Sequence, residues 1–359
     1  MATTAETEEH FSGAPAPFHM FERASDLTIV RSSVAMSHSN LSIVFAELRN
    51  VTYASVADVS QVSIVELDAK MESNNWTSIN VNYIKQDKPA MITQACLVLP
   101  TSRSIPVLVV CTDQGVQIYD VKGSKQLSSV VVTPNDQNLE ASDAWFMGTR
   151  GVTCSDCLIL VGSWSGEIHQ FFCNGETSVS AKKPVKEHNH PILDLATCKY
   201  DEVTCSVDTT GLVIVWHKPM RGAQHKINTG QDVTAINVLR KQVICGTVFG
   251  SVYLYSIITS DLMSKIDAHV RPITAISVAP ESAYMMTAAQ DGRFVIFKLH
   301  TRKPSAYQVE YRFSDEVDAG MIAGCQFITG RGSGIAVACY DANVLKMYKI
   351  VKRPALPKT

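Results

Sequence analysis

The sequence predicts an all-β fold assembled from seven copies of one small antiparallel sheet. Two observations lead to this prediction: short runs in which apolar and polar residues alternate, and a turn-and-strand pattern that recurs at a nearly constant spacing. Side chains along a strand alternate between the two faces of a sheet, so alternation indicates strands, and helical periodicity is hard to find here. A pattern that repeats every few tens of residues indicates a fold assembled from equivalent units.

Each copy contains a small or polar turn, a glycine, and an alternating strand that ends in an aromatic residue. The clear copies are TDQGVQIYD (112–120), SWSGEIHQFF (163–172), DTTGLVIVWH (208–217), TVFGSVYLYS (247–256) and AQDGRFVIFK (289–298). Their central glycines are spaced by 51, 45, 39 and 42 residues. Weaker copies, DVSQVSIVEL (58–67) and YDANVLKMYK (340–349), lie on either side of these and bring the number to seven.

A second strand-like run precedes several copies, as in HPILDLA, DVTAINV and RPITAIS, so each interval has room for four strands. Four-stranded units at this period are typical of β-propeller blades. We therefore predict a single seven-bladed β-propeller over residues 26–350, between a flexible tail (1–25) and a basic tail (351–359). The last copy has no room for a fourth strand. A strand within residues 26–33 is expected to complete it and close the ring, because closure hides open sheet edges.

The pattern resembles the WD40-repeat family over roughly residues 26–350. In that family a histidine before the first strand, an aspartate in the turn and an aromatic residue on the third strand lock each blade. His269, Asp291 and Phe297 hold these places in one copy. In another, His188 and Trp216 match, but Thr210 stands where the aspartate is expected, so the repeats are degenerate. The resemblance implies that His269 is a structural residue rather than a ligand or a catalytic base.

Four stretches narrow the resemblance to one divergent, single-propeller, intracellular member of the family. They are NLSIVFAELRNVTY, MITQACLVLP, VGSWSG and TTGLVIVW, in this order. Of these, VGSWSG followed by an alternating strand is the most specific. Nothing is carried over to residues 1–25, which depart from the pattern of that relative.

Composition and charge exclude several classes of protein. The chain of 359 residues is 46% hydrophobic and 18% charged, so it can bury a substantial core. With a net charge of −2 and scattered Lys and Arg, it is not expected to bind nucleic acid. No apolar run reaches the ~18 residues that would cross a membrane. We expect a cytoplasmic protein that reaches membranes or vesicles only through its partners.

Few residues suggest a metal site, a cofactor site or a catalytic site. Cys154 and Cys157 have the spacing of half a zinc site, but no second pair completes it. The interpretation that we favour places them at the turn between the first and second strands of a blade, with all ten cysteines reduced. Joint metal binding by His188 and His190 is a weak alternative. Glycine-rich nucleotide loops are absent, so no cofactor is expected.

One set of residues at equivalent positions of several blades suggests a protein-binding surface. Aligning the first strands on Val152, Ile192, Val233 and Ile273 places a large hydrogen-bonding residue two positions before each: Arg150, His190, Gln231 and Arg271. The turns between second and third strands open on the same propeller face and contribute Trp164, Phe249 and Arg293. Arginine and exposed aromatic residues are enriched at protein-binding hot spots, so we predict a protein-binding rim. The alternative is a solvated loop rim without a partner.

The function that follows is a non-enzymatic WD40 scaffold that presents a rigid face to peptides or loops of partner proteins. A second hypothesis is a structural subunit of a larger ciliary, trafficking or signalling assembly. A third is a propeller hydrolase or lactonase with a metal in the central tunnel, which would need converging carboxylates. The predicted innermost strands carry few of these.

Overall fold

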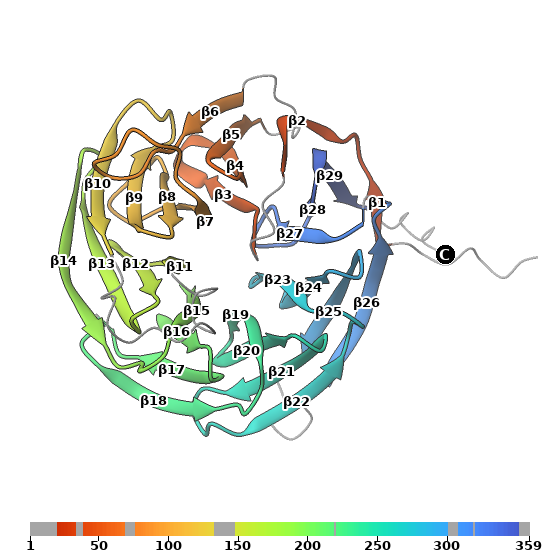
Figure 1. The fold of residues 1–359 in the computed structure, drawn as a ribbon. Helices are drawn as coiled ribbons and strands as arrows, with labels where there is room; N and C mark the ends of the chain where they lie inside the picture. Colours follow the sequence, from red (N-terminus) through yellow and green to blue (C-terminus); the bar gives the residue numbers. More distant parts are fainter. Residues whose placement is uncertain are drawn as a thin grey trace, which may run out of the picture.

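The computed structural model describes residues 20–33, 39–68, 76–132, 148–218, 220–300, 308–318 and 320–351. These residues form seven antiparallel sheets that stand radially around a central axis (Figure 1). In six of these sheets consecutive strands are neighbours, with the first strand innermost and the fourth at the outer edge of the ring. The prediction of an all-β, seven-bladed propeller is confirmed.

Six blades take their four strands from consecutive sequence. Blade 1 contains β3 (Ser42–Ala46), β4 (Val51–Asp58), β5 (Gln61–Leu67) and β6 (Trp76–Asn80). Blade 2 contains β7 (Ile92–Val98), β8 (Val107–Thr112), β9 (Gly115–Asp120) and β10 (Gln126–Val131). Blade 3 contains β11 (Thr149–Ser155), β12 (Leu158–Ser163), β13 (Glu167–Asn174) and β14 (Ser178–Lys186).

The next three blades follow the same order. Blade 4 contains β15 (Ile192–Cys198), β16 (Val203–Asp208), β17 (Leu212–Trp216) and β18 (Ala223–Asn228). Blade 5 contains β19 (Val233–Leu239), β20 (Gln242–Thr247), β21 (Ser251–Ser256) and β22 (Leu262–Asp267). Blade 6 contains β23 (Ile273–Ala279), β24 (Tyr284–Ala289), β25 (Arg293–His300) and β26 (Gln308–Glu316).

Blade 7 joins the two ends of the described chain. Its inner strands are β27 (Ile322–Phe327), β28 (Gly334–Cys339) and β29 (Ala342–Ile350), and both β1 (Phe21–Arg23) and β2 (Leu27–Ser33) pair with β29. The predicted closing strand within residues 26–33 is therefore confirmed. The predicted tail was too long, because β1 already belongs to the sheet; residues 1–19 and 352–359 lie outside the described part.

The core lies between neighbouring blades rather than at the centre of the ring. Each buried apolar cluster joins two adjacent blades; for example, Val213 and Val215 of blade 4 pack with Val243 and Cys245 of blade 5. A blade is thus covered on both faces, which explains why β8 reads as the continuous apolar run VLVVC before its terminal threonine and is buried along its whole length.

The innermost strands carry a repeated irregularity. In β7, β11, β15, β19, β23 and β27, one residue near the start is skipped in the pairing with the second strand, which is a β-bulge. In three of them this residue is a threonine whose hydroxyl donates to a backbone carbonyl of the next blade: Thr93 to Thr149 (2.5 Å), Thr234 to Ile273 (2.7 Å) and Thr274 to Ile322 (2.6 Å). The bulges therefore connect adjacent blades around the channel.

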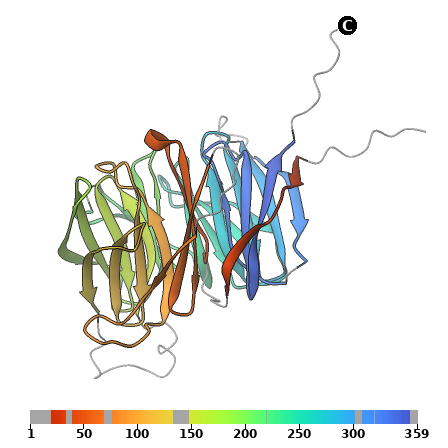
Figure 2. The same ribbon diagram turned by 90° about the horizontal axis from the view of Figure 1, so that it is seen from above.

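The ring has two faces. We call the face where the innermost strands begin the N-face; it also carries the turns between second and third strands. The opposite face, the C-face, carries the short 3-10 helix η1 (Glu47–Arg49), which stands at the top of the side view in Figure 2. Within the residues described, no helix is long and apolar enough to cross a bilayer.

His188 is the centre of a buried hydrogen-bond chain in blade 4. Its Nδ1 lies 2.8 Å from Asp208 Oδ2, and its Nε2 lies 2.6 Å from Ser206 Oγ, which also accepts a hydrogen bond from Trp216 Nε1 at 2.8 Å. Thr210 does occupy the turn position of the expected aspartate. The carboxylate comes instead from Asp208, which is two residues earlier and accepts from Thr210 Oγ1 at 2.6 Å.

His269 makes the corresponding but shorter chain in blade 6. Its Nδ1 lies 3.1 Å from Asp291 Oδ2, and its Nε2 lies 3.0 Å from Thr287 Oγ1. The side chain of Phe297 has no N–H group, so it cannot donate a hydrogen bond to Thr287 as Trp216 does to Ser206 in blade 4. Both nitrogens of the buried imidazole thus have hydrogen-bond partners within the same blade, as expected for a structural histidine.

Candidate functional site

The N-face turns lie against the following blade, which fixes their positions. Gly250 has a φ of +80°, and a Cβ added there would lie 2.2 Å from the carbonyl oxygen of His269. Gly166 has a φ of +78°, and a Cβ added there would lie 2.3 Å from the carbonyl oxygen of His188. Only glycine fits such a backbone and such an approach. The turn of Phe249 is therefore held beside Arg271, and the turn of Trp164 beside His190.

Blades 5 and 6 present an exposed apolar cluster on this face. Phe249 is 73% exposed and Val270 is 87% exposed, with Val248 partly exposed next to them. Arg271 follows Val270 and is also exposed. We call these four residues the N-face patch. Val248 and Val270 were not among the predicted site residues, although both occupy turn positions at which an apolar side chain cannot reach the core.

The other predicted rim residues differ in their surroundings. His190 is exposed and Gln231 is half-buried, both on the N-face. Arg293 is exposed and pairs with Glu316, with its Nη2 at 3.1 Å from Oε2. Trp164 was expected to be exposed, and this expectation was wrong: the side chain is half-buried, and its indole Nε1 is buried without an acceptor. Trp164 is therefore a less suitable contact residue than Phe249.

The predicted position of Arg150 on the rim was wrong. In blades 2 to 7 the first residue of the innermost strand pairs with the last residue of the second strand; in blade 3 this pair is Thr149 and Ser163, and in blade 4 it is Ile192 and Asp208. Thr149, and not Val152, is therefore the counterpart of Ile192. The alignment on apolar residues missed this because the equivalent residue in blade 3 is polar.

Arg150 consequently lies inside the strand, next to the bulge at Gly151, rather than two residues before it. It is half-buried in β11, where burial lowers the pKa of its guanidinium and Asp194 of the next blade partly offsets this effect. Its side chain makes no direct ion pair within the described residues. Arg150 is thus a residue of an innermost strand and not of the loops that form the rim.

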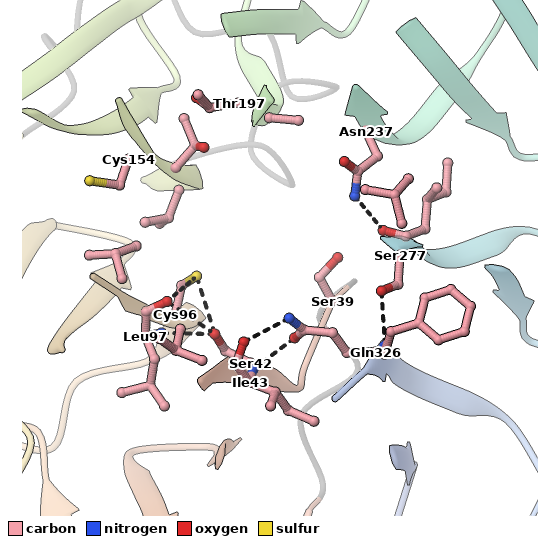
Figure 3. Close-up of a pocket in the computed structure, with 18 of the residues that line it drawn as sticks. Ser39, Ser42, Ile43, Cys96, Leu97, Cys154, Thr197, Asn237, Ser277 and Gln326 are labelled. Carbon is pink, nitrogen blue, oxygen red and sulfur yellow. Dashed lines mark hydrogen bonds between the residues drawn. The ribbon is translucent and has the colours of Figure 1, made fainter. Parts of the chain in front are cut away.

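The central channel contains a cavity of about 460 Å³. Figure 3 shows its polar wall, in which Ser42, Cys96, Thr197, Asn237, Ser277 and Gln326 surround an open centre. Several of these side chains bond to the next blade: Gln326 both accepts from Ile43 N (2.7 Å) and donates to Ile43 O (2.8 Å), which joins blade 7 to blade 1. The channel is therefore walled by groups that also hold the ring together.

Cys154 and Cys157 lie where the sequence placed them. Cys154 is buried in β11, and Cys157 is half-buried in the turn before β12, with its Sγ 3.2 Å from Thr101 Oγ1. All ten cysteines have free thiols. In the part of the chain that is described, no three His, Cys, Asp or Glu side chains gather in a position to hold a metal ion. No cofactor site is assigned.

We expect the native protein to have one rapidly reacting thiol, that of Cys157. Burial raises the pKa of the other thiols, for example to about 11 for Cys96 and about 12 for Cys111 and Cys245, so their reactive thiolates are scarce. Titration with an aromatic disulfide at pH 8 should give one fast equivalent, lost in Cys157→Ser and kept in Cys154→Ser. The denatured, non-reduced protein should give ten. One zinc per chain that disappears in Cys154→Ser would contradict this.

Seven radial blades, six of four strands and one of five, define the class together with the two histidine–carboxylate pairs: the molecule is a WD-repeat β-propeller. Within that class, the family model described as WDR54 matches residues 20–351. The chain belongs to the WDR54 family. The narrower resemblance carried by four sequence stretches is thereby confirmed.

Curated relatives match along nearly their whole length. WD repeat-containing protein 54 of Homo sapiens is 26% identical over 337 residues, covering 90% of this chain and 97% of its own. WD repeat domain 54 of Rattus norvegicus is 27% identical over 343 residues, covering 91% and 99%. Among solved structures, a chain in "Crystal Structure of Mitotic Checkpoint Complex" superposes with a TM-score of 0.70 over 98% of both chains. At 14% identity, that similarity shows the fold alone.

Proposed function

We propose that this protein is a non-enzymatic scaffold of the cytoplasm that binds segments of partner proteins on its N-face. Membership of a WD-repeat family and the propeller fold support a role in protein interaction in general. Ten free cysteines, most of them buried, suit a reducing compartment. Partners, rather than a segment of the described chain, would bring the protein to membranes or vesicles.

The observation that carries this proposal is the N-face patch of Val248, Phe249, Val270 and Arg271. Large apolar side chains that remain exposed side by side on a folded protein indicate an interaction surface. These side chains sit on turns fixed by backbone hydrogen bonds, from Val248 N to Asp232 O (3.0 Å) and from His269 N to Gly250 O (3.0 Å). A rigid surface loses little conformational entropy when it binds.

Two other functions remain as alternatives. A structural subunit of a larger ciliary, trafficking or signalling assembly would use the same patch permanently. A hydrolase or lactonase would need metal ligands that converge in the channel, and the described channel residues offer Asp194 as a deep carboxylate without a second one beside it. We favour the scaffold because the N-face patch leaves large apolar side chains exposed beside an arginine, whereas the described channel residues do not gather the ligands that a metal would need.

The test is a double variant, Phe249→Ala with Arg271→Ala. Surface truncations should change the free energy of unfolding by less than about 0.5 kcal/mol each, whereas truncation of hot-spot residues weakens binding by about 2 kcal/mol or more, roughly 30-fold. The measurement is quantitative mass spectrometry of proteins that co-purify with each variant, together with thermal unfolding. At least one partner of the wild type should be lost at unchanged stability.

The matched control is Tyr311→Ala with Arg312→Ala. It removes an exposed aromatic residue and an arginine from the outer strand β26, away from the N-face. This control should keep every partner. If the N-face double variant also keeps every partner while remaining folded, the patch is not the binding surface.

A further inference from the structure

The channel cavity is large enough for a ligand and opens at the C-face, opposite to the N-face patch. Its volume of about 460 Å³ lies within the ~300–1,000 Å³ typical of small-molecule and side-chain sites. The lining residues run from Asp194 and Gln94 in the channel wall to Phe45, Glu47 and Tyr200 at the ends of the innermost strands. The chemistry of this lining indicates what it would bind.

Deep in the cavity, the charge of Asp194 has no direct ion-pair partner among the described residues. Its oxygens accept hydrogen bonds from the backbone N–H groups of Leu195 and Ile236, both at 2.9 Å, so each oxygen keeps capacity to accept another, and the residue lines the cavity. Burial raises the pKa of Asp194 to about 6, and the backbone hydrogen bonds and the attraction of Arg150 only partly offset this. The ionised carboxylate is therefore under-compensated, and a positive charge in the cavity would stabilise it.

The mouth of the cavity combines carboxylates with aromatic rings. Glu47 and Glu281 line it together with Phe45 and Tyr200, and both rings are exposed. Burial raises the pKa of the Tyr200 phenol, and Glu281 and Glu47 raise it further, so both carboxylates act on this ring although they come from blades 6 and 1. Aromatic faces and carboxylates both attract organic cations.

Fewer positive than negative side chains line the cavity, and the other cationic groups near it lie outside the lining. Lys199 lines the mouth. Arg331 pairs with Glu281 at 2.9 Å but is 82% exposed, and an ion pair in solvent is weak and readily exchanged. Arg150 is not among the lining residues. Three carboxylates and one ammonium group thus face the cavity, which favours a cationic ligand over an anionic one.

We propose that the C-face cavity of the channel binds an organic ammonium group, which Asp194 receives at depth while Glu47, Glu281 and Tyr200 receive it at the mouth. The group could come from a lysine side chain of a partner protein or from a free polyamine. These sources share one chemistry. The site is separate from the N-face patch, so it does not depend on the scaffold function proposed above.

The experiment is calorimetric titration of the full chain at pH 7.5 with two probes and one control. The probes are spermidine and the capped peptide acetyl-Gly-Gly-Lys-Gly-Gly-amide; the control replaces lysine with norleucine, which has the same aliphatic stem without the charge. Saturable binding of spermidine alone identifies a polyamine site, and binding of the lysine peptide alone identifies a peptide site. Binding of neither probe, or equal binding of the norleucine peptide, overturns the proposal.

Variants at the mouth locate the binding event. Glu47→Gln combined with Glu281→Gln should weaken binding of the responding probe at least tenfold, and because both side chains are exposed the fold should be unaffected. The matched control is Glu202→Gln, an exposed carboxylate on the same face that does not line the cavity and pairs with Lys218. Equal loss in both variants would mean that the cation binds the surface non-specifically, and would overturn the assignment.

Acid should weaken the binding through Asp194. Because the pKa of this carboxyl is about 6, lowering the pH from 7.5 to 5.5 reduces its ionised fraction about fourfold, and the affinity should fall by a similar factor. The charged or titratable neighbours that act on it are Arg150 of β11 and Cys96 of β7, whose thiol pKa is raised by burial to about 11, so neither changes charge in this range. Asp194→Asn should bind weakly and independently of pH between these values. An unchanged pH dependence in that variant would remove Asp194 from the site.

Discussion

A chain that lacks residues 1–38 should aggregate rather than fold into a soluble monomer. Without β1 and β2, the strand β29 would present an unpaired edge along its length, and open strand edges pair with other chains. Blade 7 would also lose part of the apolar surface that covers it, because Ile29 of β2 is buried between blades 7 and 1. Size-exclusion chromatography of the soluble fraction measures this outcome.

Shorter truncations should separate the contributions of the two N-terminal strands. Deleting residues 1–19 removes only residues that precede the described sheet, and the melting temperature should stay unchanged. Deleting residues 1–25 also removes Phe21, which is 2% exposed and lies against Phe313 with ring centroids 5.5 Å apart. Loss of a buried phenylalanine costs about 3–5 kcal/mol, so this chain should be soluble but clearly destabilised.

The full-length variant Phe21→Ala is the matched control for the second truncation. It should reproduce most of the loss while keeping the backbone pairing of β1 with β29. The loss of stability should therefore increase with the length of the deletion, from residues 1–19 to 1–25 to 1–38. If all three melt at the same temperature as the intact chain, the N-terminal strands do not close the ring.

His188→Ala should be among the most destabilising single substitutions in the molecule. His188, Asp208 and Ser206 are fully buried, and removal of the imidazole leaves the carboxylate and the hydroxyl without their partner. Breaking a buried pair by removing one member costs about 3–5 kcal/mol. His269→Ala should cost less, about 1–3 kcal/mol, because its contacts with Asp291 are longer and the chain stops at Thr287. Chemical denaturation of both variants measures the difference.

The dependence of stability on pH provides a second test of the hydrogen bond between His188 and Asp208. Burial by itself would raise the pKa of Asp208, yet hydrogen bonds from His188 and Thr210 bring it below its usual value. A carboxyl whose pKa is lowered in the folded state contributes stability above its unfolded pKa of about 4, and this stability is lost as the pH falls. His188→Ala should therefore make the free energy of unfolding less dependent on acid below about pH 4. Against the effect of burial, the pKa of Asp291 is lowered by His269 in the same direction, so the two variants are distinguished by how much stability they lose, and equal losses would contradict the difference between the two hydrogen-bond chains.

The repeat could be predicted from local patterns because each blade encodes its own turns and strands. The hairpin glycines, the alternation and the lone histidines before the inner strands all act within one blade, and the structure confirms the blades that they predict. The closing strand could be predicted for a similar reason, since a count of strands leaves the last blade one short.

The positions of Arg150, Trp164 and Asp208 could not be predicted in this way. The place of Arg150 was missed because β11 begins at the polar Thr149 where the other aligned strands begin at an apolar residue, so the apolar pattern gave the wrong alignment. Trp164 occupies a turn, where the local pattern predicts exposure, yet its side chain is half-buried in the folded ring. Asp208 replaces the expected turn carboxylate only because the folded turn directs it to His188.

The sequence by itself thus determined the number of blades, their strand order and the way the ring closes, because hydrogen-bond pairing and turn conformation are local properties of the chain. Only the tertiary structure decided which side chains meet across blades: the exposure of Phe249 beside Val270, and the placing of Asp194 in the channel with Glu47 and Glu281 at its mouth. These groups come from different blades. Burial and charge in such sites are set by the approach of whole sheets, and no single repeat carries that information.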